Sequence, residues 1–263
     1  MLNSQRRPAD KWKMNAALAA VAFAPGLAVG SFVNVVAARL PLRRSVVHPR
    51  SACMSCGNEL AWHDNVPLLS YALLRGRCRS CGVRIGLLYP AVELATALLV
   101  VACFVRFGLS GRAVIAAFFC VVLVAVSAID LIHRIIPNRI VVPAAALVLV
   151  AQTALRPSPE WALASLGAAL FLFVAALAYP AGMGMGDVKL ALLMGAALGR
   201  TVSVAMMTGM LAALVPSLYL LARHGGAARK MAIPFGPFLA LGSVIALFAG
   251  GSLLHEYWQL FGR

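Results

Sequence analysis

Residues 113–132 read AVIAAFFCVVLVAVSAIDLI, and this stretch decides the class of fold. It is apolar from Ala113 to Ile129 apart from Ser127, and its one charged residue, Asp130, stands near its end. A helix of about 20 such residues rises about 30 Å, which is the thickness of the hydrocarbon core of a bilayer. The stretch therefore predicts a membrane-spanning helix with an aspartate close to one membrane surface.

Apolar stretches of this kind recur along the chain. Its 263 residues are 62% hydrophobic and 12% charged, with a mean hydropathy of +0.89. A soluble domain carries about twice that charged fraction. No small-residue cleavage site follows the first apolar run, so we expect that run to be kept as a span. We predict an all-α polytopic membrane protein with about eight transmembrane helices, at residues 15–37, 89–107, 113–132, 139–155, 161–180, 184–199, 201–222 and 233–254.

One long polar segment, residues 39–88, separates the first two predicted spans. It carries eight arginines against two acids, Glu59 and Asp64. If this segment is cytoplasmic, 14 Lys and Arg residues fall on the cytoplasmic side and 9 on the other, although four of the nine lie in the N-terminal tail. Such an excess is the positive-inside bias of membrane proteins. The net charge of +15 therefore needs no nucleic-acid partner, and we expect the lipid bilayer as the surroundings of the chain.

The same segment holds a repeated cysteine motif. Cys53 and Cys56 form one C-x-x-C-G turn, and Cys78 and Cys81 form another after 21 intervening residues. Four thiolates with this spacing are typical of a structural Zn²⁺ site, and the glycines permit the tight turns. A segment of about fifty mostly polar residues cannot build a sufficient core, so a metal would supply folding energy. A redox dithiol or two disulfides are the alternatives, which a reducing cytoplasm disfavours.

Two aspartates fall at the edges of predicted spans. Asp130 ends the third span, and Asp187 opens the sixth, so on this topology both lie near the cytoplasmic surface. An ionisable group bordering a span is a functional hypothesis by default. In the alternative reading, Asp130 pairs with Arg134 and Asp187 caps a helix.

Three alternating glycines precede the second aspartate. Gly182, Gly184 and Gly186 remove side chains from this stretch, and Lys189 follows. A substrate backbone could therefore approach closely and pair with the chain as an added strand. We predict that these four residues form a substrate-approach loop beside Asp187.

A pair of close carboxyl groups has the chemistry of an aspartyl protease. Like charges held together share one proton, so the ionised partner can deprotonate water while the protonated partner polarises a carbonyl. The sequence therefore predicts Asp130 and Asp187 as a catalytic dyad. A proton-coupled transporter or a zinc-bearing membrane scaffold is the alternative, although transporters place such acids near the bilayer midplane. A protease that cleaves other transmembrane substrates shares the same chemistry.

An ordered set of motifs along the chain resembles the prepilin peptidase family. It extends from the first span to the last. The motifs are Gly30-Ser-Phe-Val-Asn34 with Arg39-Leu-Pro41, the paired C-x-x-C turns, Trp62-His-Asp64-Asn65-Val-Pro67, Tyr89-Pro90 with Val92-Glu93-Leu94, Asp130 before Ile136-Pro137-Asn138, Gly184-Met-Gly186-Asp187-Val-Lys189 and Pro234-Phe-Gly236-Pro237.

This resemblance implies a bifunctional membrane enzyme of the bacterial cytoplasmic (inner) membrane. Members remove the basic leader of type IV prepilin or pseudopilin precursors, and many methylate the new terminal amine with S-adenosyl-L-methionine. The implied domains are an N-terminal tail with the first helix (1–38), a cytoplasmic zinc-binding, methyltransferase-associated domain (39–88) and a seven-helix aspartyl protease domain (89–263). No nucleotide-binding glycine motif follows a strand, so methyl transfer rests on the resemblance, and the residues that bind its cofactor are not assigned.

Three further polar residues carry open interpretations. Asp64 and Glu93 could meet the basic leader or the methyl-acceptor amine, or each could pair with a neighbouring arginine. Asn34, inside the first span, is expected to hydrogen-bond another helix.

Overall fold

The computed structural model describes residues 8–178, 184–225 and 233–261. Within these ranges the regular structure is helical and no strand forms. Two isolated backbone bridges, Ala52 with Glu59 and Arg77 with Arg84, are the extended pairings found there. The predicted all-α fold is confirmed.

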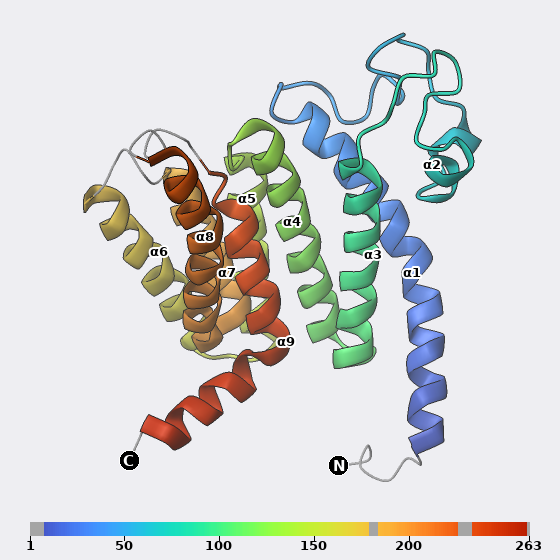
Figure 1. The fold of residues 1–263 in the computed structure, drawn as a ribbon. Helices are drawn as coiled ribbons and strands as arrows, with labels where there is room; N and C mark the ends of the chain where they lie inside the picture. Colours follow the sequence, from blue (N-terminus) through green and yellow to red (C-terminus); the bar gives the residue numbers. More distant parts are fainter. Residues whose placement is uncertain (1–7, 179–183, 226–232, 262–263) are drawn as a thin grey trace. The chain divides into compact units, whose positions relative to one another are not determined.

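Each predicted span corresponds to one long helix (Figure 1). Two short elements, η1 and α2, lie in the segment between the first two long helices, and η2 separates α7 from α8. The elements are α1 (Pro8–Arg39), η1 (Trp62–Asn65), α2 (Leu69–Leu73), α3 (Leu88–Phe107), α4 (Gly111–His133), α5 (Asn138–Leu155), α6 (Glu160–Ala178), α7 (Met185–Leu198), η2 (Gly199–Thr201), α8 (Val202–His224) and α9 (Gly236–Phe261).

Seven helical stretches in the described ranges are long and apolar enough to cross a membrane. One of them, Met185–His224, is 40 residues long and contains both α7 and α8, which we predicted as separate spans. Pro25, Pro143 and Pro216 lie inside long helices, as membrane helices allow. The protein is a multi-pass membrane protein.

The chain forms two compact units, Met1–Ala125 and Val126–Arg263, with the boundary inside α4. The division into three parts at residues 38 and 88 stays a prediction.

Glycines bring α1 against α3 in the first unit. A Cβ atom on Gly26 would lie 2.8 Å from the Cα atom of Ala97, and one on Gly30 would lie 2.7 Å from the Cα atom of Glu93. Two glycines four residues apart form the small-residue interface that membrane helices use for close packing. Asn34 adds an interhelical hydrogen bond by donating from Nδ2 to the carbonyl oxygen of Tyr89 at 3.0 Å. The bond expected of Asn34 is confirmed.

The second unit is built around α7, of whose 14 residues ten are buried. This helix contacts α5, α6, α8 and α9. A Cβ atom on Gly195 would overlap the backbone of Ala164 and Ser165 on α6, so only glycine allows this approach. Ser165 Oγ also donates to the carbonyl oxygen of Leu192 at 2.7 Å. The helix that begins beside Asp187 is thus enclosed by protein.

We predict that Gly195→Ala destabilises the protein whereas Gly167→Ala does not. The first change forces α6 and α7 apart and should lower the free energy of unfolding by about 1–3 kcal/mol. Gly167 is an exposed position in α6 with no atom within 4 Å of an added Cβ, so alanine there should be neutral or slightly stabilising. Thermal unfolding in one detergent measures both, and equal effects of the two changes would contradict the packing role.

Candidate functional site

Asp130 is held by the first residue of a distant helix. It lies near the end of α4, is 5% exposed, and its Oδ2 accepts a hydrogen bond of 2.9 Å from the backbone N–H of Gly236. Gly236 begins α9, where backbone N–H groups have no partner inside the helix. A Cβ atom at position 236 would lie 2.9 Å from the same oxygen, so a glycine is needed for this approach.

Asp187 is the third residue of α7 and is 8% exposed. Its backbone N–H donates to the carbonyl oxygen of Gly184 at 3.1 Å, and its carboxylate is hydrogen-bonded by the backbone N–H of Gly184. This reciprocal pattern resembles a capping box, with Gly184 as the N-cap residue. The charge of Asp187 also interacts with that of Asp130, so the fold brings the two predicted acids together.

The alternative readings of these acids have different outcomes. No ion pair joins Asp130 to Arg134 among the described residues; the two are linked by an ordinary backbone bond from the Arg134 N–H to the Asp130 carbonyl oxygen. Asp187 does take part in capping α7, so for this residue the structural reading holds beside the functional one. Both acids lie within one turn of a helix end, not in the middle of a span.

The glycine run has two different surroundings. Gly182 lies outside the described residues. Gly184 is exposed, whereas a Cβ atom on Gly186 would lie 2.8 Å from the Cβ atom of Ile136. The space freed at Gly186 is therefore filled by the segment between α4 and α5. Close approach by a backbone from outside remains a prediction for Gly184.

Lys189 connects α7 with α5. Its Nζ donates to Oδ1 of Asn138 at 2.9 Å, and Asn138 is the first residue of α5. Gly236, Ile136 and Asn138 were not among the predicted site residues. Each stands beside a proline in the sequence and marks a helix start or a connecting segment, which is the signal that could have found them.

The four predicted cysteines form one cluster in the first unit. Their Sγ atoms all lie within 4.8 Å of one another, and those of Cys53 and Cys81 are 3.8 Å apart. Two sulfurs bound tetrahedrally to one zinc ion at about 2.3 Å are about 3.8 Å apart, so the cluster fits a metal ion. Gly57 and Gly82 have φ of +74° and +70°, as the tight turns require. All six cysteines are free thiols.

The thiols of the cluster differ in acidity. Backbone N–H groups of Cys56 and Ser55 lower the pKa of Cys53 to about 6. For Cys81 the N–H of Val83 acts in the same direction, but desolvation and hydrogen bonds with the neighbouring thiols outweigh it and raise the pKa to about 11. Cys53 is therefore ready to bind a metal as a thiolate at neutral pH.

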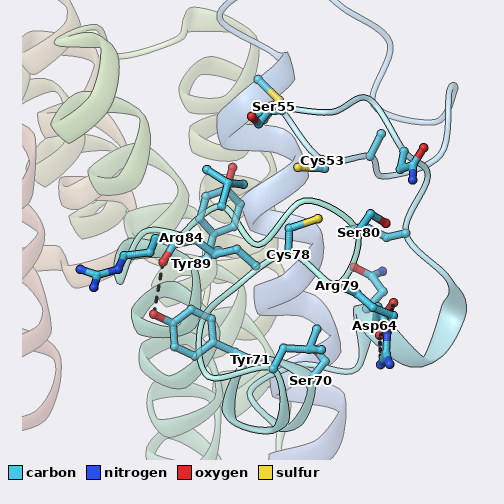
Figure 2. A pocket seen from close by; sticks show the side chains of 18 of the residues that line it. Cys53, Ser55, Asp64, Ser70, Tyr71, Cys78, Arg79, Ser80, Arg84 and Tyr89 are labelled. Atoms are coloured by element: carbon cyan, nitrogen blue, oxygen red, sulfur yellow. Dashed lines mark hydrogen bonds and ion pairs between the residues drawn. The ribbon is translucent and has the colours of Figure 1, made fainter.

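A cavity of about 560 Å³ lies beside this cluster (Figure 2). Its walls come from both cysteine turns, from α2 and from the first residues of α3. Figure 2 shows Cys53 and Cys78 on one side of the cavity, Ser70 and Tyr71 on the other, and Tyr89 beside them. Tyr71 is fixed by a hydrogen bond of 3.3 Å from its hydroxyl group to the carbonyl oxygen of Ile85.

The two acids left open by the sequence have separate roles here. Arg79 clamps Asp64 with hydrogen bonds of 2.6 and 3.0 Å, and these bonds lower the pKa of the Asp64 carboxyl. Glu93 Oε2 instead accepts a bond of 2.9 Å from the backbone N–H of Leu68. Pairing with an arginine is thus confirmed for Asp64, while Glu93 forms no ion pair with any residue in the described ranges.

Fold and sites together define a polytopic helical membrane protein with a buried aspartate pair and a four-cysteine cluster. Residues 25–107 match the family described as Bacterial Peptidase A24 N-terminal domain, and residues 117–258 match the Type IV leader peptidase family. The chain belongs to the family of prepilin leader peptidase/N-methyltransferases. The resemblance found in the sequence is confirmed.

Individual relatives with that printed name cover most of the chain. One from Bacillus subtilis (strain 168) is 36% identical over 245 residues, which is 91% of this chain and 98% of that protein. One from Pseudomonas aeruginosa (strain PAO1) is 36% identical over 270 residues, 90% of this chain and 92% of that protein. One from Myxococcus xanthus (strain DK1622) is 53% identical over 121 residues, 46% of this chain and 36% of that protein. No solved structure matches the chain.

We predict that iodoacetamide modifies Cys53 faster than Cys81 in metal-free protein at pH 7. Cys53 is mainly thiolate there, because its pKa is about 6, whereas the pKa of Cys81 is about 11. Its rate should fall as pH drops through about 6, since the thiolate is then protonated. Peptide mass spectrometry measures both rates. Exposure alone predicts the opposite order, because Cys81 is exposed and Cys53 is not fully so.

Proposed function

We propose that this protein removes the basic leader peptide from type IV prepilin or pseudopilin precursors at the cytoplasmic edge of the bacterial inner membrane. The observation that carries the proposal is the buried pair Asp130 and Asp187, each within one turn of a helix end and close enough for their charges to interact. Membership of the leader peptidase family supports the same reaction.

The two carboxyl groups supply the proton transfers of peptide hydrolysis. With one shared proton, the ionised acid takes a proton from water as its oxygen attacks the scissile carbonyl carbon, and the protonated acid donates to the carbonyl oxygen. Breaking the carbon–nitrogen bond then passes a proton to the leaving amine. The backbone donors Gly236 and Gly184 hold the two carboxylates in place, so neither has to be ordered when the substrate arrives.

The predicted approach loop of Gly182, Gly184, Gly186 and Lys189 would receive the substrate backbone. Exposed Gly184 adjoins Asp187 and offers no side chain to exclude an extended segment. Lys189 is held by Asn138, which supports a positioning role at the start of α7. A proton-coupled transporter is not favoured, because both acids sit near helix ends and close together.

A second activity, N-methylation of the newly exposed amine, is supported by the names of the relatives and by the intact cysteine cluster. We propose Zn²⁺ as the metal held by Cys53, Cys56, Cys78 and Cys81, in a structural role, because four thiolates leave no ligand position open. S-adenosyl-L-methionine would supply the methyl group.

We predict that Asp130→Asn or Asp187→Asn removes nearly all leader cleavage, by about 10²- to 10⁴-fold, because each acid carries one of the two proton transfers. Purified variants are incubated with a prepilin, and leader loss is followed by mass spectrometry. Glu256→Gln, an exposed acid on α9, should leave cleavage unchanged. Cleavage that survives in either folded aspartate variant rules out the dyad.

We also predict that the purified protein carries one zinc per chain and that the two activities separate. Cys78→Ser should release the metal, loosen the cysteine segment and reduce methylation of a pre-cleaved pilin more than leader removal. Asp187→Asn should do the reverse. Metal analysis and mass spectrometry of the pilin report the outcome, with Cys103→Ala as a control that leaves the cluster intact. Failure of Asp187→Asn protein to methylate a pre-cleaved pilin would show that the sites are not separate.

A further inference from the structure

We propose that the cavity beside the cysteine cluster binds S-adenosylmethionine and that the Glu93 carboxylate lies against the positive charge of this ligand. The inference rests on the methyl transfer proposed above and assigns it a place in the chain. It starts from the shape of the cavity, the pairing of its acids and the position of Glu93.

The cavity has the size and lining of a small-molecule site. Its volume of about 560 Å³ lies within the range of about 300–1,000 Å³ typical of ligand pockets. Tyr71 and Tyr89 provide aromatic surface for a purine ring, and Leu74 and Ile85 add apolar contacts. Such a lining suits the adenosyl part of the ligand.

Charge pairing distinguishes Glu93 from the other acid at the cavity. Arg79 already neutralises Asp64, so that carboxylate has no charge left to offer. Glu93 is half-buried, and its one hydrogen bond to a described residue comes from the neutral N–H of Leu68. Arg84 also lines the cavity, but its guanidinium group extends away from the other labelled side chains (Figure 2).

A half-buried carboxylate without a cation favours a positively charged ligand. S-adenosylmethionine carries two such groups, its sulfonium and its α-ammonium. The ligand chemistry therefore matches both the apolar wall and the unpaired acid.

The backbone of Glu93 is fixed at the membrane end of the cavity. Glu93 is the sixth residue of α3, a candidate membrane span, and its Cα atom lies against Gly30 of α1. With its charged end here, the ligand would present its methyl group toward the membrane surface. That is where an amine newly exposed by leader removal would emerge.

The variant Glu93→Gln separates charge from structure. Its amide oxygen can still accept the Leu68 N–H, while the negative charge is lost. For the purified full-length protein, isothermal titration with S-adenosylmethionine should show at least about tenfold weaker binding in this variant, as expected for one lost ion contact. Its melting temperature and zinc content should stay unchanged. Glu256→Gln provides the same chemical change outside the cavity and should bind like the parent protein.

A second ligand identifies the charged group that Glu93 meets. S-adenosylhomocysteine keeps the ammonium but has a neutral sulfur. If Glu93→Gln weakens only S-adenosylmethionine, the carboxylate faces the sulfonium; if it weakens both equally, it faces the ammonium. Both results support the proposal.

Unchanged binding of S-adenosylmethionine by folded Glu93→Gln protein overturns it. A higher KM for pre-cleaved pilin in that case would assign Glu93 to the acceptor amine instead. If the parent protein methylates pilin while photo-crosslinked S-adenosylmethionine maps only outside residues 52–93, the location is wrong and the activity stands. A parent protein that neither binds this ligand nor methylates pilin refutes the proposed methyl transfer itself.

Discussion

The second unit depends on close backbone contact between α6 and α7 at Gly195. Helices in a bilayer gain little from the hydrophobic effect when they associate, because lipid tails are as apolar as their side chains. Packing at short range and hydrogen bonds must therefore hold the bundle together. The bond from Ser165 to Leu192 strengthens this crossing, and the enclosed helix that results begins at the site acid Asp187.

The first unit uses the same principle for a different purpose. Gly26 and Gly30 bring α1 against α3, and this contact fixes Tyr89 and Glu93 below the cysteine segment. The segment itself contains only short helical elements and two isolated bridges. A metal held by the four thiols would give it the stability that its small core cannot.

The acids of this protein fall into two groups according to their partners. Asp64 and Glu160 face Arg79 and Arg200, and these ion pairs tie neighbouring elements together. Asp130 and Glu93 are held instead by backbone N–H groups, those of Gly236 and Leu68. A neutral donor fixes the position of a carboxylate but does not cancel its charge. Acids of the second kind remain able to act on a substrate or a ligand, which is why we assign functions to them.

The sequence by itself determined the helical class, the approximate spans, the two tight cysteine turns and the two aspartates at span ends. These features follow from composition and local spacing, which the chain carries wherever it folds. Only the tertiary structure decided which donor holds Asp130, what fills the space beside Gly186, and which of Asp64 and Glu93 is neutralised. The bond from Gly236 to Asp130 joins residues 106 positions apart, and it depends on how each helix is rotated in the bundle. Rotation is set by contacts among several helices at once, so no single stretch of sequence encodes it.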